Sequence, residues 1–411
     1  MSTLATDVEG RLSEAVQGSL AAASDADQVG GMRPRWVASP ASVDEVAAVL
    51  RLASDSDLAV VPRGAATRLQ WGAAPERCDV VLDLTRLDGL VEHTAGDLVA
   101  VAQAGMRLDD LQARLASAGQ WLAVDPPRRG TVGGLVATAA TGPTRLLHGP
   151  VRDLVIGTTM VRADGVVAKS GGKVVKNVAG YDLGKLLTGS YGTLGVIVQV
   201  AFRLHPLPER SEWVTVPVRS ATEVQDVVLH VAHSHLVAAG VELDWSGGSG
   251  AVSVRLDGIP SGVQARTQDA LTVLGPDAAD SDSAPEWWGT EPAGGDLLLK
   301  LTHEVDSLGR VLAAIDTAAG AAGANAHTRG SAAVGTLDVA VEGGDPAAVV
   351  DRLREVAPSF GGTVVVLDAP AAVKAALDVW GPVHGLDLMR RVKHQFDLHR
   401  VLSPGRFVGG I

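Results

Sequence analysis

The chain has 411 residues, of which 46% are hydrophobic, and a net charge of -12. This length is enough for two or three globular domains, and the composition leaves little room for disordered tails. The acidic balance disfavours nucleic acid and anionic lipid as partners. Because Cys78 is the only cysteine, this chain alone can form neither a disulfide nor a four-thiolate iron–sulfur cluster. It also lacks a basic-then-apolar leader and any run of about 18 apolar residues. We expect a cytoplasmic protein without direct membrane insertion, reaching a membrane only through partners.

The first two hundred residues mix helical and strand patterns. Ser42 and Glu45 stand at capping-box spacing, and apolar residues recur on one face after them, which predicts an amphipathic helix over 42–53. Helical spacing returns at 107–119. Strand-like runs occupy 58–64, 79–85 and 98–105.

Turn-forming residues dominate 121–200, with only short strands between them. Glycine costs about 0.5 to 1 kcal/mol relative to alanine in regular structure. Such a cluster therefore indicates a backbone that approaches a ligand closely.

A second pattern begins after Pro206. Two runs of alternating strands and helices, separated by the polar loop 275–296, predict a second α+β domain over 211–372. The tail contains a helical segment at 386–401 that is basic for its length, and we expect it to pack back on the first domain.

Three glycine-rich segments carry the chemistry. In VVPRGAATRLQWG, at 60–72, a strand runs into a turn whose backbone N–H groups suit a pyrophosphate. It is not a Rossmann turn, because Trp71, Gly72 and Pro75 interrupt any helix. The alternative is an ordinary surface turn. The other two segments are DPPRRGTVGGLVATAATGP at 125–143 and GGKVVKNVAGYDLGKLLTGSYGTLGVI at 171–197.

In this order, the three segments resemble the FAD-binding domain of the vanillyl-alcohol oxidase and p-cresol methylhydroxylase (PCMH) superfamily. KNVAGYDL, GSYGTLGV and the ending FDLHRVLSPGRF are similar to the FAD-binding subunit of bacterial glycolate oxidase. The resemblance implies an α+β fold in which a two-subdomain PCMH-type FAD-binding domain is joined to an α+β cap or substrate domain. The expected divisions are an N-terminal segment 1–32, the FAD domain 33–210, the cap domain 211–372 and a C-terminal segment 373–411.

The resemblance also implies the residues that contact FAD. We expect the first loop to wrap the pyrophosphate, the second segment to contact the diphosphate, ribityl chain and flavin ring, and the third to lie against adenine or ribose. An RD pair also recurs in the family. The expected contacts are Pro62, Arg63, Gly64, Ala65, Ala66 and Thr67; Thr131, Val132, Gly133, Gly134, Thr138 and Gly142; Arg152 and Asp153; and Gly195, Val196 and Ile197.

Two positions depart from the family pattern. Ala66 stands where glycine is common, and Ser403 stands where asparagine usually precedes Pro-Gly. The first loop lacks a histidine for covalent attachment and Cys78 lies outside the motif, so we expect non-covalent FAD.

A 2-hydroxy acid requires a cation for its carboxylate and a base for its hydroxyl group. Our catalytic candidates are Lys173, Lys176, Asn177 and Tyr181, which lie in a motif that resembles one near the flavin. The alternative is that the lysines are solvated and the other two residues brace the loop. No metal site is expected, because no carboxylate at matching spacing joins the histidines at 230, 233 and 235.

The sequence thus predicts an FAD-binding oxidoreductase that belongs to a glycolate or D-2-hydroxy acid dehydrogenase (glycolate oxidase) complex as one of its subunits. It would oxidise a small 2-hydroxy acid to a 2-oxo acid or relay its electrons, with a second flavoprotein subunit and an iron–sulfur subunit as partners. One alternative is a self-sufficient FAD-dependent alcohol or sugar oxidase. Another is a non-catalytic structural subunit with a degenerate flavin site, an alternative that Ala66 keeps open.

Overall fold

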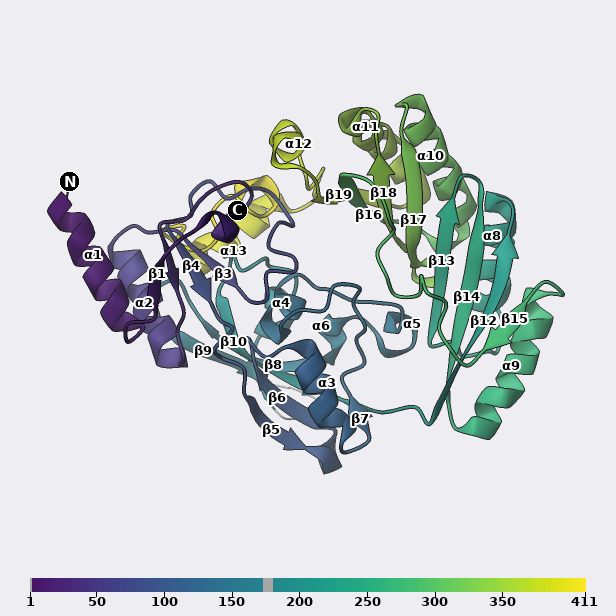
Figure 1. Cartoon of the computed structure of the whole chain (residues 1–411), viewed down its shortest axis with the longest axis horizontal. Helices are drawn as coiled ribbons and strands as arrows, with labels where there is room; N and C mark the ends of the chain where they lie inside the picture. Colours follow the sequence, from purple (N-terminus) through teal and green to yellow (C-terminus); the bar gives the residue numbers. More distant parts are fainter. Residues whose placement is uncertain (1, 173–179) are drawn as a thin grey trace.

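The computed structural model describes residues 2–172 and 180–411 and has two lobes that lie side by side (Figure 1). In this described part, the first lobe contains a four-stranded and a five-stranded sheet, and the second contains one eight-stranded sheet. The predicted mixed class of helices and sheets is confirmed.

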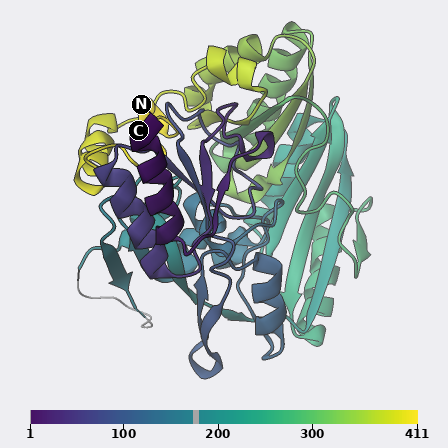
Figure 2. The same cartoon turned by 60° about the vertical axis from the view of Figure 1, so that its left-hand side comes forward.

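The four-stranded sheet has the order β1-β2-β4-β3, with β1 antiparallel to β2 and the other pairs parallel. The side chains of Val46 and Leu50 on α2 pack with Val60 and Val80 of the sheet in one buried cluster. The predicted cap is confirmed, since Ser42 Oγ accepts the N–H of Glu45 at 3.2 Å. Helices α1 and α2 lie side by side on the outside of the lobe (Figure 2). The elements are α1 (Ser2–Ala15), β1 (Leu20–Ala22), β2 (Trp36–Ala38), α2 (Val43–Asp55), β3 (Val60–Arg63) and β4 (Val80–Asp83).

The five-stranded sheet is antiparallel throughout, with the order β5-β6-β10-β8-β9. The sequence predicted turns and short strands over 121–200, whereas the structure also has helices of four to six residues there. Helices this short show no apolar periodicity. The strands are β5 (Leu90–Thr94), β6 (Val99–Gln103), β8 (Val155–Val161), β9 (Val167–Gly171) and β10 (Val196–Arg203), with β7 (Gln120–Trp121) paired to β11 (His205–Pro206); the helices are α3 (Leu108–Ala116), α4 (Val132–Ala137), α5 (Arg145–His148), α6 (Val151–Leu154) and α7 (Leu183–Leu187).

The second lobe is built on an antiparallel sheet with the order β15-β12-β14-β13-β17-β18-β16-β19. The strands are β12 (Arg210–Val218), β13 (Gly240–Ser246), β14 (Ser249–Gly258), β15 (Ala279–Ser281), β16 (Leu297–Thr302), β17 (Asn325–Ser331), β18 (Thr336–Glu342) and β19 (Thr363–Asp368). The helices are α8 (Ala221–Ala232), α9 (Pro260–Leu274), α10 (Leu308–Ala321) and α11 (Pro346–Val356).

Two elements of this lobe had no clear sequence signal. Helix α9 buries Thr267 and Ala270 along with larger residues, which weakens its apolar stripe. Strand β17 reads NAHTRGS and presents polar side chains on both faces, so the alternation expected of a half-buried strand is missing.

The eight-stranded sheet presents a polar face to the first lobe. On β13, Leu243 and Trp245 belong to the apolar core of the second lobe, and Trp245 Nε1 donates to Asp316 of α10 at 3.2 Å. Because side chains alternate along a strand, Glu242 and Asp244 point the other way, to the side where α5 meets β13. An ion pair from Arg128 to Glu291, at 2.8 Å, joins the lobes across this interface.

The tail returns to the first lobe through α12 (Ala371–Ala376) and α13 (Leu386–Phe396). The N–H of Val60 donates to the carbonyl oxygen of Val401 at 2.7 Å. Lys393 Nζ, on α13, donates to the carbonyl oxygen of Thr193 at 2.8 Å. The C-terminal segment is therefore part of the wall around the first lobe.

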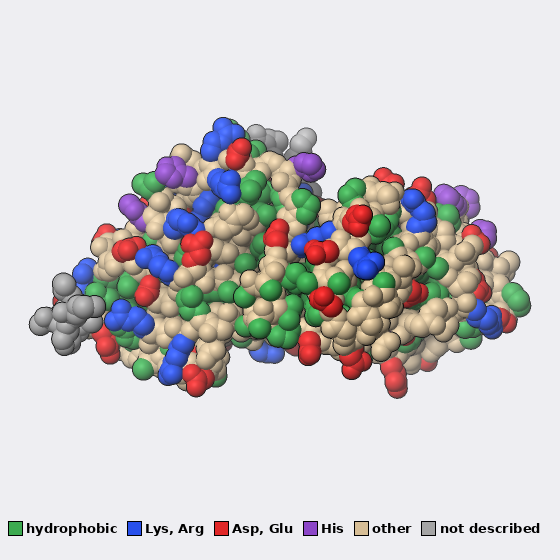
Figure 3. Space-filling model, turned by 90° about the horizontal axis from the view of Figure 1, so that it is seen from above, with side chains coloured by type: hydrophobic (Ala, Val, Ile, Leu, Met, Phe, Trp, Pro, Cys, Tyr) green, Lys and Arg blue, Asp and Glu red, His purple; other side chains and the backbone are tan. Residues whose placement is uncertain are grey.

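The surface carries charges of both signs, and basic and acidic side chains are interspersed over both lobes in the view of Figure 3. Among the residues that the structure describes, no helix combines the length and apolarity needed to cross a membrane.

Candidate functional site

A cavity lies in the first lobe between its two sheets. Its empty volume is about 760 Å³, part of it open to solvent, which is within the usual range for ligand pockets, about 300–1,000 Å³. Four stretches of the chain form most of its wall: β3 with the loop after it, α4, the segment entering β10, and the C-terminal tail; Leu84 and Ala104 complete it. The lining residues are Pro62, Arg63, Gly64, Ala65, Ala66, Thr67, Arg68, Leu69, Leu84, Ala104, Thr131, Gly133, Gly134, Ala137, Thr138, Tyr191, Gly192, Gly195, Ile197 and Arg406.

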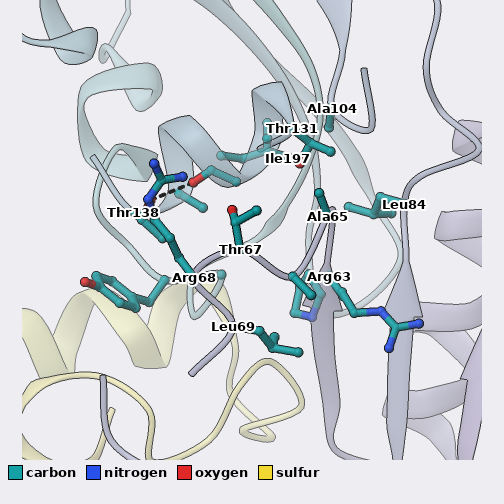
Figure 4. Close-up of a pocket in the computed structure, with 18 of the residues that line it drawn as sticks. Arg63, Ala65, Thr67, Arg68, Leu69, Leu84, Ala104, Thr131, Thr138 and Ile197 are labelled. Atoms are coloured by element: carbon teal, nitrogen blue, oxygen red, sulfur yellow. Dashed lines mark hydrogen bonds between the residues drawn. The ribbon is translucent and has the colours of Figure 1, made fainter. Parts of the chain in front are cut away.

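The loop after β3 is anchored by a charged group that faces away from the cavity. The guanidinium of Arg63 pairs with Asp27 at 2.6 Å and with Asp83 at 2.7 Å, and Figure 4 shows its side chain turned away from Thr67. These bonds hold the pKa of Asp27 down at about 2. Arg63 therefore fixes the base of the loop, and its own charge is already balanced.

The tip of the same loop offers donors to the cavity. In the part of the chain that the structure describes, the backbone N–H groups of Ala65, Ala66 and Thr67 donate no hydrogen bond. Ala66 has a φ of 59°, in the left-handed region. A left-handed residue within a run of unpaired N–H groups makes a concave anion-binding nest, so the loop geometry fits a phosphate group.

The opposite wall is α4 and its flanks, and glycines let the walls meet. A Cβ on Gly64 would lie 2.0 Å from Thr131 Oγ1, and one on Gly133 would lie 2.8 Å from the Cβ of Ala104. Figure 4 shows Thr67, Arg68, Thr131 and Thr138 among the side chains that surround the cavity. These glycines are therefore required by the close approach of one cavity wall to another; the close approach to a ligand that the sequence predicted for 121–200 stays a prediction.

Arg406 brings a buried positive charge to the cavity wall, and it was not among the predicted site residues. Its side chain is 5% exposed, and Nη2 donates to the carbonyl oxygens of Leu69 at 2.6 Å and Trp71 at 2.8 Å. Nε has no partner among the described residues, and burial lowers the pKa of Arg406 to about 10. The described residues provide no carboxylate partner for this cation, so an anion in the cavity suits it.

Two further titratable lining residues, Arg68 and Tyr191, were missed. Burial lowers the pKa of Arg68 to about 10, and its guanidinium donates to the carbonyl oxygen of Arg128. Burial raises the pKa of Tyr191 to about 12, so this phenol stays neutral. The Tyr191 ring packs 4.9 Å from Trp380 and 5.9 Å from Phe407 between centroids. Arg68 lies in VVPRGAATRLQWG, Tyr191 in GSYGTLGV and Arg406 in the SPGRF ending, so the sequence marked all three segments by resemblance but did not mark these side chains as contacts.

Most of the predicted FAD contacts lie on this wall, and five do not. Val132 and Val196 are buried outside the lining, Arg152 and Asp153 are exposed on α6, and Gly142 lines a second pocket between the lobes. The structure brings the remaining ones together around one cavity: Pro62, Arg63, Gly64, Ala65, Ala66, Thr67, Thr131, Gly133, Gly134, Thr138, Gly195 and Ile197.

The predicted catalytic residues have no described contact with this cavity. Lys173, Lys176 and Asn177 lie outside the described residues. Tyr181 is 91% exposed and is not part of the cavity wall. Its carbonyl oxygen accepts the hydroxyl of Ser170 at 2.8 Å, so the backbone of Tyr181 anchors β9 while the phenol points into solvent.

Comparison with known proteins identifies the fold of the chain that forms this cavity. Residues 34–171 match the family described as FAD binding domain. The structure of p-cresol methylhydroxylase has the same fold, with a TM-score of 0.76, 15% identity, and coverage of 99% of this chain and 97% of that one. Residues 34–171 are therefore similar to the FAD binding domain family, and the chain as a whole has the fold of p-cresol methylhydroxylase. FAD is the cofactor of the matched domain.

Two sequence relatives of this chain are informative. An uncharacterised FAD-linked oxidoreductase of Mycobacterium tuberculosis is 27% identical over 92% of this chain and 91% of its own length. The glycolate oxidase subunit GlcE of Escherichia coli is 39% identical over 38% of this chain and 44% of its own length. The chain is an FAD-binding oxidoreductase related to glycolate oxidase subunits.

Proposed function

We propose that the cavity of the first lobe holds FAD non-covalently, with the pyrophosphate on the loop from Gly64 to Thr67. The unpaired N–H groups at the tip of this loop carry the proposal, because phosphate oxygens are the acceptors that such a nest suits. Arg406 supplies a counter-charge from the opposite end of the sequence. The loop after β3 and the C-terminal tail would thus both contact the cofactor.

The remaining wall residues would orient the cofactor. The absence of a Cβ at Gly133 lets α4 pack against Ala104 at the cavity wall, while Thr138, whose Oγ1 donates to the Gly134 carbonyl at 2.7 Å, holds the end of α4. Bound flavin accepts a hydride equivalent from a substrate carbon. The chain's own residues bind and orient it.

We further propose that the substrate is a small 2-hydroxy acid such as glycolate or D-lactate, and that the chain works with a second flavoprotein subunit and an iron–sulfur subunit. The similarity to a glycolate oxidase subunit supports this assignment. The single cysteine supports it as well, because electrons that leave through an iron–sulfur cluster need thiolates from another chain.

Two measurements on the purified chain test these proposals. Flavin absorption bands, with the flavin released into the supernatant on acid precipitation, are expected for non-covalent FAD; a colourless protein even after incubation with FAD overturns the cofactor site. Anaerobic addition of glycolate or D-lactate is then expected to bleach the bands, either with the chain alone or once the partner subunits are added. Bands that persist under both conditions overturn the substrate assignment.

A matched pair of glycine variants locates the cofactor. Gly133→Ala places a methyl group against Ala104 at the cavity wall, whereas Gly96→Ala places one in open space. We expect the first variant to lose flavin during purification and the second to retain it. Equal flavin content in both, with both folded, would place the cofactor elsewhere.

A further inference from the structure

A second pocket lies between the two lobes and is lined by charged side chains. Its empty volume is about 400 Å³, including space open to solvent. The two pockets share one segment of the chain, because Thr138 lines the first cavity and Thr141 lines this pocket. The lining residues are Pro127, Thr141, Gly142, Pro143, Arg145, Glu242, Gly289, Thr290, Lys300, Arg329, Gly330, Ser331, Thr336 and Asp338.

The floor of the pocket is a row of alternating charges across four strands. Asp244 on β13 is in register with Arg329 on β17, Arg329 with Asp338 on β18, and Asp338 with Lys300 on β16. Residues in register share one face of a sheet, and this is the polar face that the sheet presents to the first lobe. Sheet register therefore gathers groups that lie far apart in the sequence.

One end of this row is already satisfied. Arg329 Nε donates to Asp244 at 2.5 Å, and the rest of its guanidinium donates to the Thr290 hydroxyl at 2.8 Å and to the Glu291 carbonyl at 2.9 Å. His327 Nε2 also lies 2.7 Å from Asp244. These groups are hydrogen-bonded to one another, so few of their donors and acceptors remain for a ligand.

The other end of the row is poorly satisfied. Within the described residues, Asp338 Oδ1 is buried without a hydrogen-bond partner, and Lys300 Nζ lies 4.0 Å from it. Among the residues that the structure describes, Arg145, at the start of α5, donates only to the hydroxyl groups of Thr141 and Thr336, each at 3.5 Å. Buried polar groups normally have partners, so this end has unused donors and an unused acceptor that face one another across a pocket.

Glu242 stands beside these groups on β13. Its carboxyl group accepts the Ser331 hydroxyl at 2.5 Å. Burial raises the pKa of Glu242 to about 8, and Asp125 and Asp338 act in the same direction while Arg145 opposes them. At neutral pH Glu242 is therefore protonated. Burial raises the pKa of Asp338 as well, while Lys300, Arg128 and Arg145 oppose that shift. The two cations Arg145 and Lys300 are therefore not fully balanced by the carboxyl groups beside them, so the pocket has capacity for a further negative charge.

We propose that this pocket binds a small 2-hydroxy acid, with Arg145 and Lys300 pairing its carboxylate and Asp338 accepting a hydrogen bond from its hydroxyl group. The inference rests on the proposed function and deepens it by assigning the substrate's binding groups. An arginine fork and an ammonium are the donors that a carboxylate prefers. The free oxygen of Asp338 supplies the acceptor that distinguishes a hydroxy acid from a plain carboxylate.

Calorimetric titration of the flavin-loaded chain with glycolate and with acetate tests the assignment. We expect glycolate to bind at least about tenfold more tightly than acetate, because only glycolate offers a hydroxyl group to Asp338. Arg145→Gln and Lys300→Met are each expected to weaken glycolate binding by about 10- to 100-fold, the effect of losing a charge-assisted hydrogen bond. Arg219→Gln, an exposed arginine on the same lobe paired with Asp277, is the matched control and should bind as the unaltered chain does.

The flavin absorption of each variant separates the two proposals. Variants that retain flavin and lose glycolate binding support the pocket. Flavin-loaded variants that bind glycolate as tightly as the unaltered chain overturn the assignment of this pocket, whether or not the cofactor proposal holds. Lys300→Met keeps the test open if Arg145→Gln does not fold, because Lys300 has no hydrogen bond within the described part of the chain to lose.

Discussion

Arg406 Nη2 donates a hydrogen bond of 2.6 Å to the carbonyl oxygen of Leu69, a residue 337 positions earlier in the chain. This contact ties the tail to the end of the loop that follows β3. The cavity wall is therefore complete only when the C-terminal segment is in place, and a charge from that segment faces the cofactor site.

Replacement of Arg406 by glutamine tests the role of this charge. Glutamine retains donors but removes the cation, and loss of a charge-assisted contact to a phosphate is expected to weaken FAD binding by about 10- to 100-fold. Fluorescence titration of the apo-protein with FAD measures the effect. Arg400→Gln, which removes an exposed ion pair with Glu76, is the control with no expected change. Equal FAD affinity in both variants would show that Arg406 is only structural.

Ala66 carries a backbone strain that glycine would relieve. A left-handed conformation costs a residue with a Cβ about 1 to 2 kcal/mol, and glycine gives back part of that through the entropy of the unfolded chain. We expect Ala66→Gly to raise the free energy of unfolding of the apo-protein by about 1 kcal/mol. Ala65→Gly, at a neighbour without a positive φ, should lower it by about 0.4 to 1 kcal/mol. Denaturant titration compares the two, and a destabilised Ala66→Gly would contradict this account.

The buried carboxyl of Glu242 makes stability depend on pH. Its pKa rises from the ordinary 4.5 to about 8 on folding, so between these values the folded state binds a proton that the unfolded state has lost. The contribution of Glu242 to the free energy of unfolding therefore falls as pH rises from about 5 to 8. We expect Glu242→Gln to remove part of this slope, on the order of a few kcal/mol across the interval. Denaturant titrations at several pH values measure the slope, and an unchanged slope in the variant would mean that Glu242 is ionised in the fold.

Lys393 fastens the tail to the first lobe. Its ammonium group pairs with the buried Asp397 at 2.6 Å and donates to the carbonyl oxygens of Thr193 and Leu402. Lys393→Met leaves Asp397 buried without its counter-charge, so we expect a loss of about 3 to 5 kcal/mol in unfolding free energy. The control on the same helix is Arg390→Met, whose exposed pair with Asp387 is expected to contribute about 0.5 kcal/mol or less. Similar stabilities of the two variants would contradict this role.

The sequence predicted the parts of the fold that local chemistry determines. The Ser42 cap, the helix that follows it and the strand before Gly64 could be read from residue spacing, because caps, apolar periodicity and glycine turns act within a few residues. Helix α9 escaped because Thr267 and Ala270 on its buried face are not strongly apolar.

The site was predictable in part for the same reason. Segments that contribute backbone, such as Gly64 to Thr67, have a motif that can be recognised. Tertiary packing brings Arg406 to the first cavity. Packing and sheet register gather a separate cluster, Arg145, Lys300 and Asp338, at the second pocket. No spacing in the sequence encodes those contacts.

The central claim is that the first-lobe cavity binds FAD through its backbone nest and Arg406. The most direct measurement is an absorption spectrum of the purified chain before and after incubation with FAD and removal of the excess. We expect the purified chain to show flavin bands that correspond to one FAD per chain. If the chain is purified without flavin, we expect these bands to appear in full after incubation with FAD. A folded chain that remains colourless after incubation would contradict it.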